Sequence, residues 1–188
     1  MSNLDIKYNN TKIVDGVFLT PLETKNEPTI TYTSSNNNDF YTLIMYDSKA
    51  VSKNNNHNHM LITNIPSSSL NEGNLTKSDT ILPYTGPAPP INSGTHIYNF
   101  ELYKQNGNIN KIEFNDSDRV ISLSDTKKKI GINNLTPIAS QYFYSEYTSN
   151  GGKKLKNKKR KRKTVKKNKT IRKNKTIRKN KNITPFLI

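Results

Sequence analysis

The sequence ILPYTGPAPPINSGTHIYNFELYKQ, residues 81–105, joins a segment rich in proline and glycine to a segment with alternating apolar positions. Proline locks φ and glycine tolerates conformations that other residues avoid, so the first segment predicts an open loop. From His96 onward, a period of two predicts a strand with His96, Tyr98, Phe100 and Leu102 on one face. Two polar side chains therefore lie at the loop end of an apolar strand face, an arrangement that predicts a polar pocket at the rim of a β core.

The same stretch resembles the second signature of the phosphatidylethanolamine-binding protein family, which also includes the Raf kinase inhibitor proteins. That signature reads roughly Y-V-G-x-G-P-P-x-G-T-G-x-H-R-Y-x-W. The positions that match it without a gap are Tyr84, Gly86, Pro89, Pro90, Gly94, His96, Tyr98 and Gln105. The resemblance implies a single all-β domain with small helices.

A second region resembles the family's first signature, in which Y-T-L-x-M precedes D-P-D-A-P-S-R and H-H-F-L-x-x-N. The matching positions are Tyr41, Thr42, Leu43, Asp47, Ala50, Ser52, His59, Leu61 and Asn64. The departures are Ser48 and Val51 for the two prolines, Lys49 for the second Asp, Lys53 for Arg and Asn58 for the first His. Because prolines shape this loop in the family, we expect a different loop shape here. The whole resemblance covers roughly residues 13–147.

Local patterns predict the remaining elements. β-branched and aromatic runs predict strands at residues 29–33, 40–46 and 60–65, a short strand at 111–114, and a final aromatic strand at 141–147. Residues 66–79 form a polar connection. Ser124 is the expected N-cap of a brief helix through Lys129, with Asp125 in its first turn.

Charge divides the chain into two parts. Residues 153–181 contain 18 of the 30 Lys and Arg, whereas all 14 Asp and Glu lie at or before Glu146, so residues 1–152 carry 12 basic and 14 acidic side chains, a net of −2. We therefore expect a near-neutral domain at residues 1–150 and a disordered Lys/Arg-rich tail at 151–188. The absence of cysteine, of an apolar leader and of a membrane-length apolar run favours an intracellular protein, in the cytoplasm or nucleus.

Carried over position by position, the family resemblance implies a small anion pocket. Its residues are Asp47, His59, Ala88, Pro89, His96 and Tyr98. Imidazole N–H and phenol O–H groups can donate to phosphate oxygens, while Asp47 orients a histidine. Lys49 would add positive charge if its side chain turns inward. The implied protein is a non-enzymatic binding module without cofactor, metal or catalytic residue. Its implied partners are a phospholipid head group or phosphorylated ligand, and a protein kinase.

Three other interpretations of these residues are open. His57, His59, His96 and Asp47 are acceptable zinc or iron ligands, although their spacing does not require a metal. Ser93 or Ser52 with His96 and Asp47 could form a hydrolytic triad, but no nucleophile elbow or oxyanion signature accompanies them. Taken alone, His57 in its Asn-rich loop is expected to be solvated.

The basic tail is the second strong signal. After Gly151 and Gly152, a run of Lys and Arg precedes two copies of N-K-T-I-R-K, at residues 168–173 and 174–179. Charge repulsion and the lack of an apolar face predict disorder. The residues expected to contact nucleic acid or an anionic membrane surface are Lys158, Lys159, Arg160, Lys161, Arg162, Lys163, Arg172 and Arg178.

This tail resembles the C-terminal extensions of proteins from large AT-rich DNA viruses, which implies a viral origin and packaging in the virion. The alternative function is therefore a virion- or nucleic-acid-associated protein that acts through its tail, with a degenerate pocket. A tail that only raises solubility is the plainest interpretation.

Overall fold

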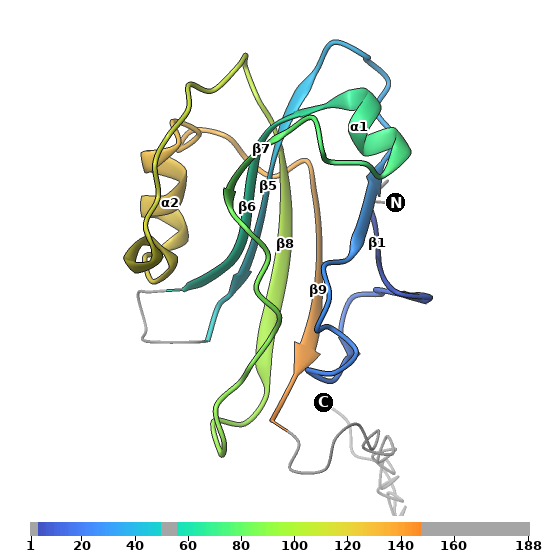
Figure 1. The fold of residues 1–188 in the computed structure, drawn as a ribbon, viewed down its shortest axis with the longest axis vertical. Coiled ribbons are helices and arrows are strands. Elements are labelled where there is room, and N and C mark those ends of the chain that lie inside the picture. The colour runs from blue at the N-terminus through green and yellow to red at the C-terminus, as the bar shows by residue number, and fades with distance from the viewer. Residues whose placement is uncertain (1–3, 50–55, 148–188) are drawn as a thin grey trace, which may run out of the picture. The chain divides into compact units, whose positions relative to one another are not determined.

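A computed structural model describes residues 4–49 and 56–147. The chain divides into two units, Met1–Lys154 and Leu155–Ile188. The second unit lies outside the described residues, as do the residues of the predicted hinge and basic tail, so the domain boundary and the tail stay predictions. Within the first unit two β-sheets are accompanied by small helices, which confirms the predicted fold class (Figure 1).

The larger sheet has six strands in the spatial order β3-β9-β8-β5-β6-β7. Their bounds are Val17–Phe18 (β3), Phe40–Asp47 (β5), His57–Pro66 (β6), Asp79–Leu82 (β7), His96–Lys104 (β8) and Ala139–Ser145 (β9). Neighbours pair antiparallel except β3 with β9. The strand predicted from His96 is therefore a central strand, held between β5 and β9.

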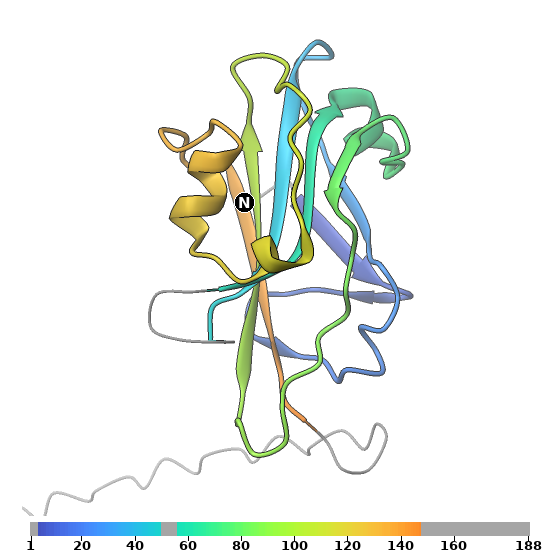
Figure 2. The same ribbon diagram turned by 60° about the vertical axis from the view of Figure 1, so that its left-hand side comes forward.

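The smaller sheet has the order β2-β1-β4 and packs on one face of the larger one (Figures 1 and 2). Its strands are Leu4–Tyr8 (β1), Thr11–Lys12 (β2) and Thr29–Tyr32 (β4). The main core lies between the sheets, where Tyr98 and Phe143 stack with ring centroids 5.2 Å apart. All four predicted core-face positions of β8 are buried, so the period of two located this face correctly.

The opposite face of the larger sheet is covered by the η1 turn (Asp116–Arg119) and helix α2 (Leu123–Lys129) (Figure 2). Ile44, Leu61 and Tyr103 are buried beneath this layer. Because both faces of the sheet are covered, β5 is buried along almost its whole length and its sequence shows a continuous apolar run.

The predicted helix cap is wrong by two residues. Ser122, in extended conformation, is the N-cap, and its Oγ accepts from the Asp125 backbone N–H at 3.0 Å. Ser124 instead lies exposed inside the first turn of α2. The earlier start brings Leu123 into the helix, from which it packs against the second apolar cluster.

Other predicted boundaries also need correction. Residues 111–114 form no strand, because Ile112 and Phe114 pack on the second cluster without a strand partner. The polar connection contains helix α1 (Ser67–Glu72), which Ser67 fixes by donating its hydroxyl to the backbone carbonyls of Asn36 and Asp39. The last strand, β9, begins two residues earlier than predicted and ends two residues earlier. Among the described residues, no helix is long and apolar enough to cross a membrane.

Candidate functional site

Strand register gathers the candidate residues on one face of the larger sheet. Asp47, the last residue of β5, is paired with His57 of β6 on one side and with Tyr98 of β8 on the other. Directly paired residues point to the same face, and residues two positions apart in a strand do so as well. His59 and His96, each two residues from a paired position, are therefore directed to that same face.

The loop before β8 closes this group into a cavity of about 420 Å³. All six residues of the predicted pocket line it: Asp47, His59, Ala88, Pro89, His96 and Tyr98. Gly86 lets the loop approach the N-terminal segment, because an added Cβ would lie 3.0 Å from the Thr24 carbonyl oxygen. The Tyr84 hydroxyl donates to that same oxygen at 2.6 Å. Contacts with Thr24 thus explain two of the signature positions, Tyr84 and Gly86.

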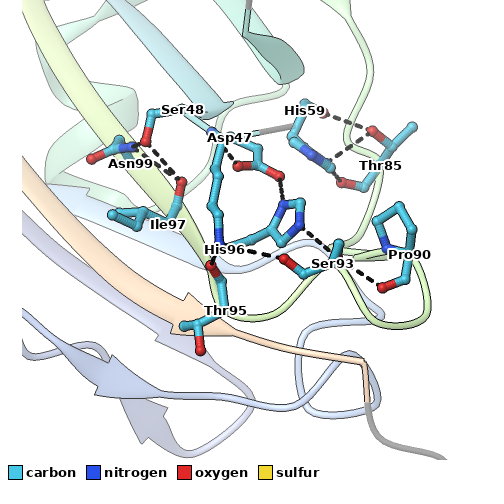
Figure 3. Close-up of polar contacts among 11 residues, drawn as sticks. Asp47, Ser48, His59, Thr85, Pro90, Ser93, Thr95, His96, Ile97 and Asn99 are labelled. Carbon is cyan, nitrogen blue, oxygen red and sulfur yellow. Dashed lines mark hydrogen bonds and ion pairs between the residues drawn. The ribbon is translucent and has the colours of Figure 1, made fainter. Parts of the chain in front are cut away.

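Asp47 and His96 form the centre of the site (Figure 3). Asp47 Oδ2 and His96 Nδ1 are 2.6 Å apart, and each residue is only 2% exposed. The other carboxylate oxygen, Oδ1, accepts from the Lys49 backbone N–H at 2.8 Å. Burial, together with the nearby negative charge of Asp47, raises the pKa of Tyr98. Asp47 is thus occupied by protein donors and acts by orienting His96, as expected from the sequence.

Ser93 extends this arrangement into a chain of hydrogen bonds (Figure 3). Its Oγ lies 2.7 Å from the Pro90 carbonyl oxygen and 2.8 Å from His96 Nε2. A carbonyl only accepts, so the Pro90 oxygen competes with His96 Nε2 for the Ser93 hydroxyl proton. A carboxylate also only accepts, so His96 Nδ1–H donates to Asp47.

This proton arrangement bears on the hydrolytic alternative. Ser93, His96 and Asp47 do lie in the order of a catalytic triad. In a resting hydrolase, however, the serine donates to a neutral histidine that then acts as a base. Here Ser93 Oγ also lies 2.7 Å from the Pro90 carbonyl oxygen, which competes with His96 Nε2 for the hydroxyl proton. The other candidate nucleophile, Ser52, lies outside the described residues.

His59 has a different protonation state from His96. Its Nδ1 lies 2.8 Å from the Thr85 carbonyl oxygen, which requires a hydrogen on Nδ1. Burial lowers the pKa of His59 to about 4, so the ring is neutral near pH 7 and its Nε2 is an acceptor. The expectation that His57 is solvated is wrong. It lies half-buried in the cavity wall, with its ring centroid 4.6 Å from that of His59. Its pKa is lowered mainly by burial and, to a smaller extent, by the positive charge of Arg119.

Arg119 is a lining residue that the sequence reading missed. It is only 9% exposed, and its guanidinium donates to the backbone carbonyls of Asn58 and Pro83, each at 3.1 Å. These bonds hold η1 against β6 and the loop while keeping a permanent positive charge at the cavity. The one feature of the sequence that could have pointed to this residue is its type, because Arg119 is the one arginine among the 12 basic residues before residue 153.

Lys49 does not add a free charge to the cavity. Its Nζ donates to the carbonyl oxygens of Thr95, at 2.8 Å, and Ser93. It therefore ties the end of β5 to the loop, in a position where the family signature has Asp. Within residues 4–49 and 56–147, no three His, Asp or Glu side chains are arranged to hold a metal ion.

Comparisons with known proteins place this geometry in context. A sequence model of the family described as phosphatidylethanolamine-binding protein matches residues 7–145. The chain is 38% identical over 81 residues to the carboxypeptidase Y inhibitor of Saccharomyces cerevisiae, covering 40% of this chain and 37% of the inhibitor. It is 30% identical over 147 residues to a 26 kDa secreted antigen of Toxocara canis, covering 73% of this chain and 53% of the antigen. The matches thus span only a third to a half of these relatives.

Solved structures show the same fold. The carboxypeptidase Y inhibitor, solved in complex with its cognate proteinase, superimposes with a TM-score of 0.60 at 23% identity, covering 77% of this chain and 83% of that one. A phosphatidylethanolamine-binding protein from Plasmodium vivax gives a TM-score of 0.60 at 18% identity, covering 77% and 85%. At these identities the likeness concerns the fold alone.

Proposed function

The chain belongs to the phosphatidylethanolamine-binding protein family, and on this premise we propose that it holds a phosphate-bearing ligand in the cavity formed by β5, β6, β8 and the loop before β8. The ligand is a phospholipid head group or a phosphorylated molecule. The cavity of about 420 Å³ suits such a group, being near the lower end of the ~300–1,000 Å³ typical of small-molecule pockets. The proposed binding involves no chemical conversion.

The observation that carries this proposal is the buried Asp47–His96 pair at the cavity wall. Asp47 orients His96 at the cavity wall, and Arg119 supplies a permanent cation there. Charge-assisted hydrogen bonds to an anion are about twice as strong as neutral ones. The Pro90 carbonyl oxygen competes with His96 Nε2 for the Ser93 hydroxyl proton, which supports binding rather than hydrolysis.

The test is calorimetric titration of the full chain with phosphorylethanolamine and inorganic phosphate at moderate salt. We expect His96→Ala to weaken binding at least about tenfold, because the ligand takes the place of Ser93 Oγ at His96 Nε2 and the variant loses that hydrogen bond. Lys128→Ala is the matched control, because it removes one positive charge from an exposed position on α2. Equal affinity in His96→Ala and in the unmodified chain would remove the cavity from the proposal.

Members of this family also bind proteins, as the yeast inhibitor does in the complex with its proteinase. A protein kinase as partner of this chain stays a prediction. A second candidate function follows from the charge division in the sequence, because residues 153–181 contain 18 basic residues and no acidic residue. Such a segment would bind nucleic acid or an anionic membrane through charge, independently of the cavity.

A further inference from the structure

His59 is held in one orientation by two hydrogen bonds to the same residue. Its ring Nδ1–H donates to the Thr85 carbonyl oxygen at 2.8 Å, and its own backbone carbonyl accepts from the Thr85 backbone N–H at 2.9 Å. The ring also meets the Tyr98 ring edge to face, with centroids 5.1 Å apart. These contacts fix which ring nitrogen faces the wall, and they leave Nε2 as the nitrogen that can meet a ligand.

Nε2 of His59 is therefore an acceptor in a cavity whose other polar groups are mainly donors. Among the described residues, no hydrogen bond reaches this atom, and it is not among the buried polar atoms that lack a partner. Burial supports the same tautomer, since it lowers the pKa of His59 to about 4 and keeps the ring neutral.

An anion that fills this cavity must satisfy both kinds of group. The Arg119 guanidinium and the N–H groups at the cavity wall favour negatively charged oxygens. His59 Nε2 instead needs a hydrogen from the ligand, and it repels an oxygen that brings only lone pairs. A site built to receive a hydrogen bond from a ligand strongly rejects an analogue that lacks the hydrogen.

We propose that His59 makes the cavity selective for an oxyanion that carries its own proton, such as the monoanion of a phosphate monoester. The P–O–H group donates to His59 Nε2, while the charged oxygens face His96 and Arg119. This inference rests on the proposed function and narrows its ligand: a phosphate monoester or inorganic phosphate is accepted. A phosphodiester, which includes the head group of an intact phospholipid, is disfavoured, and so is sulfate.

Two isomeric probes separate the effect of the ligand's P–O–H hydrogen from the effects of charge and size. Ethyl phosphate and dimethyl phosphate have the same atoms, and at about pH 5.5, below the second pKa of ~6 of a monoester, both are mainly monoanions. Only the ethyl ester keeps a P–O–H group. His59 remains neutral there, and the charged or titratable groups around it are His57, Asp47, Tyr98 and Arg119.

We expect the full chain to bind ethyl phosphate at least about tenfold more tightly than dimethyl phosphate in calorimetric titrations. His59→Phe keeps an aromatic ring against Tyr98 but removes the acceptor, so the preference should disappear through weaker binding of ethyl phosphate. Tyr142→Phe is the control: it removes a polar group from an aromatic ring of β9 outside the cavity and should retain the preference.

Equal affinity for the two isomers in the unmodified chain, or a preference that survives in His59→Phe, would overturn this inference. If His59→Phe does not fold, the inference is tested on the unmodified chain alone, with sulfate as a third probe that carries no proton. Sulfate binding as tight as that of ethyl phosphate would also overturn the inference. Equal binding of all probes that still depends on His96 leaves the proposed function standing. Absence of any His96-dependent binding contradicts both proposals.

Discussion

At the scale of single residues, the three histidines show that identical side chains acquire different roles from their partners. His96 faces a carboxylate and a hydroxyl, and its Nδ1–H donates to the carboxylate. His59 faces a backbone carbonyl and is left with one acceptor nitrogen. His57 is half-buried beside Arg119, which disfavours its charged form. The partner atoms, rather than the residue type, thus decide which histidine binds an anion and which selects among anions.

The neutral state of His59 predicts loss of stability in acid. Its pKa is lowered by burial to about 4 in the folded protein, against ~6.5 in an unfolded chain. The unfolded chain therefore takes up the proton first as pH falls. The contribution to the free energy of unfolding is complete above about pH 6.5 and is lost progressively toward pH 4, by about 3 kcal/mol in total.

Urea unfolding of the full chain between about pH 7 and pH 4 measures this loss. His59→Phe should flatten the pH dependence by about the same amount, because phenylalanine takes up no proton. His57→Phe should flatten it less, since that ring is only half-buried. An unchanged slope in His59→Phe would show that other groups cause the acid sensitivity.

At the scale of elements, the site depends on the register of three strands and on the layer that covers them. Asp47 stands opposite both His57 and Tyr98, and a one-residue slip of β5 would turn its carboxylate to the opposite face of the sheet. The η1–α2 layer holds Arg119 at the cavity and buries Tyr103 on the opposite face. Helix α2 therefore supports the site although none of its residues lines the cavity.

Two serine variants can test whether α2 is capped by Ser122, as the structure shows, or by Ser124, as the sequence predicted. Ser122→Ala should lower the free energy of unfolding by about 1 kcal/mol, the usual effect of losing an N-cap side chain. Ser124→Ala, two residues later and exposed, should change it by less than about 0.5 kcal/mol. Denaturant midpoints of the two variants decide the matter, and the reverse order would place the helix start at Ser124 after all.

At the scale of the whole molecule, the net charge of +16 comes from a region separate from the candidate site, because residues 1–152 have a net charge of −2. Two activities on one chain should then respond differently to salt and to mutation. A ligand bound in the cavity against the buried Asp47–His96 pair is screened less than one on an exposed surface, whereas a polycation releases counterions from nucleic acid and loses affinity steeply with salt.

The logarithm of the association constant of the full chain for a DNA duplex should therefore fall linearly with the logarithm of the salt concentration. The expected slope is about −5 or steeper if about six phosphates are neutralised. Removing residues 153–188 should abolish this binding, while His96→Ala leaves it unchanged. A shallow slope, or DNA binding that survives the truncation, would contradict a tail-driven interaction.

The sequence alone was enough to predict the β domain, the buried face of β8 and the six residues that meet in the cavity. These features depend on the alternation of apolar and polar residues, on proline and glycine, and on two signatures. Each of these patterns can be recognised within a short continuous segment of the chain. Arg119, the role of His57 and the contact of Lys49 with the loop depend on segments far apart in the chain. Only the tertiary structure decided them, because a hydrogen bond to a distant backbone carbonyl leaves no periodic pattern in the sequence. The proton positions on His59 and His96 belong to the same class, since each is determined by the acceptor that folding places beside the ring.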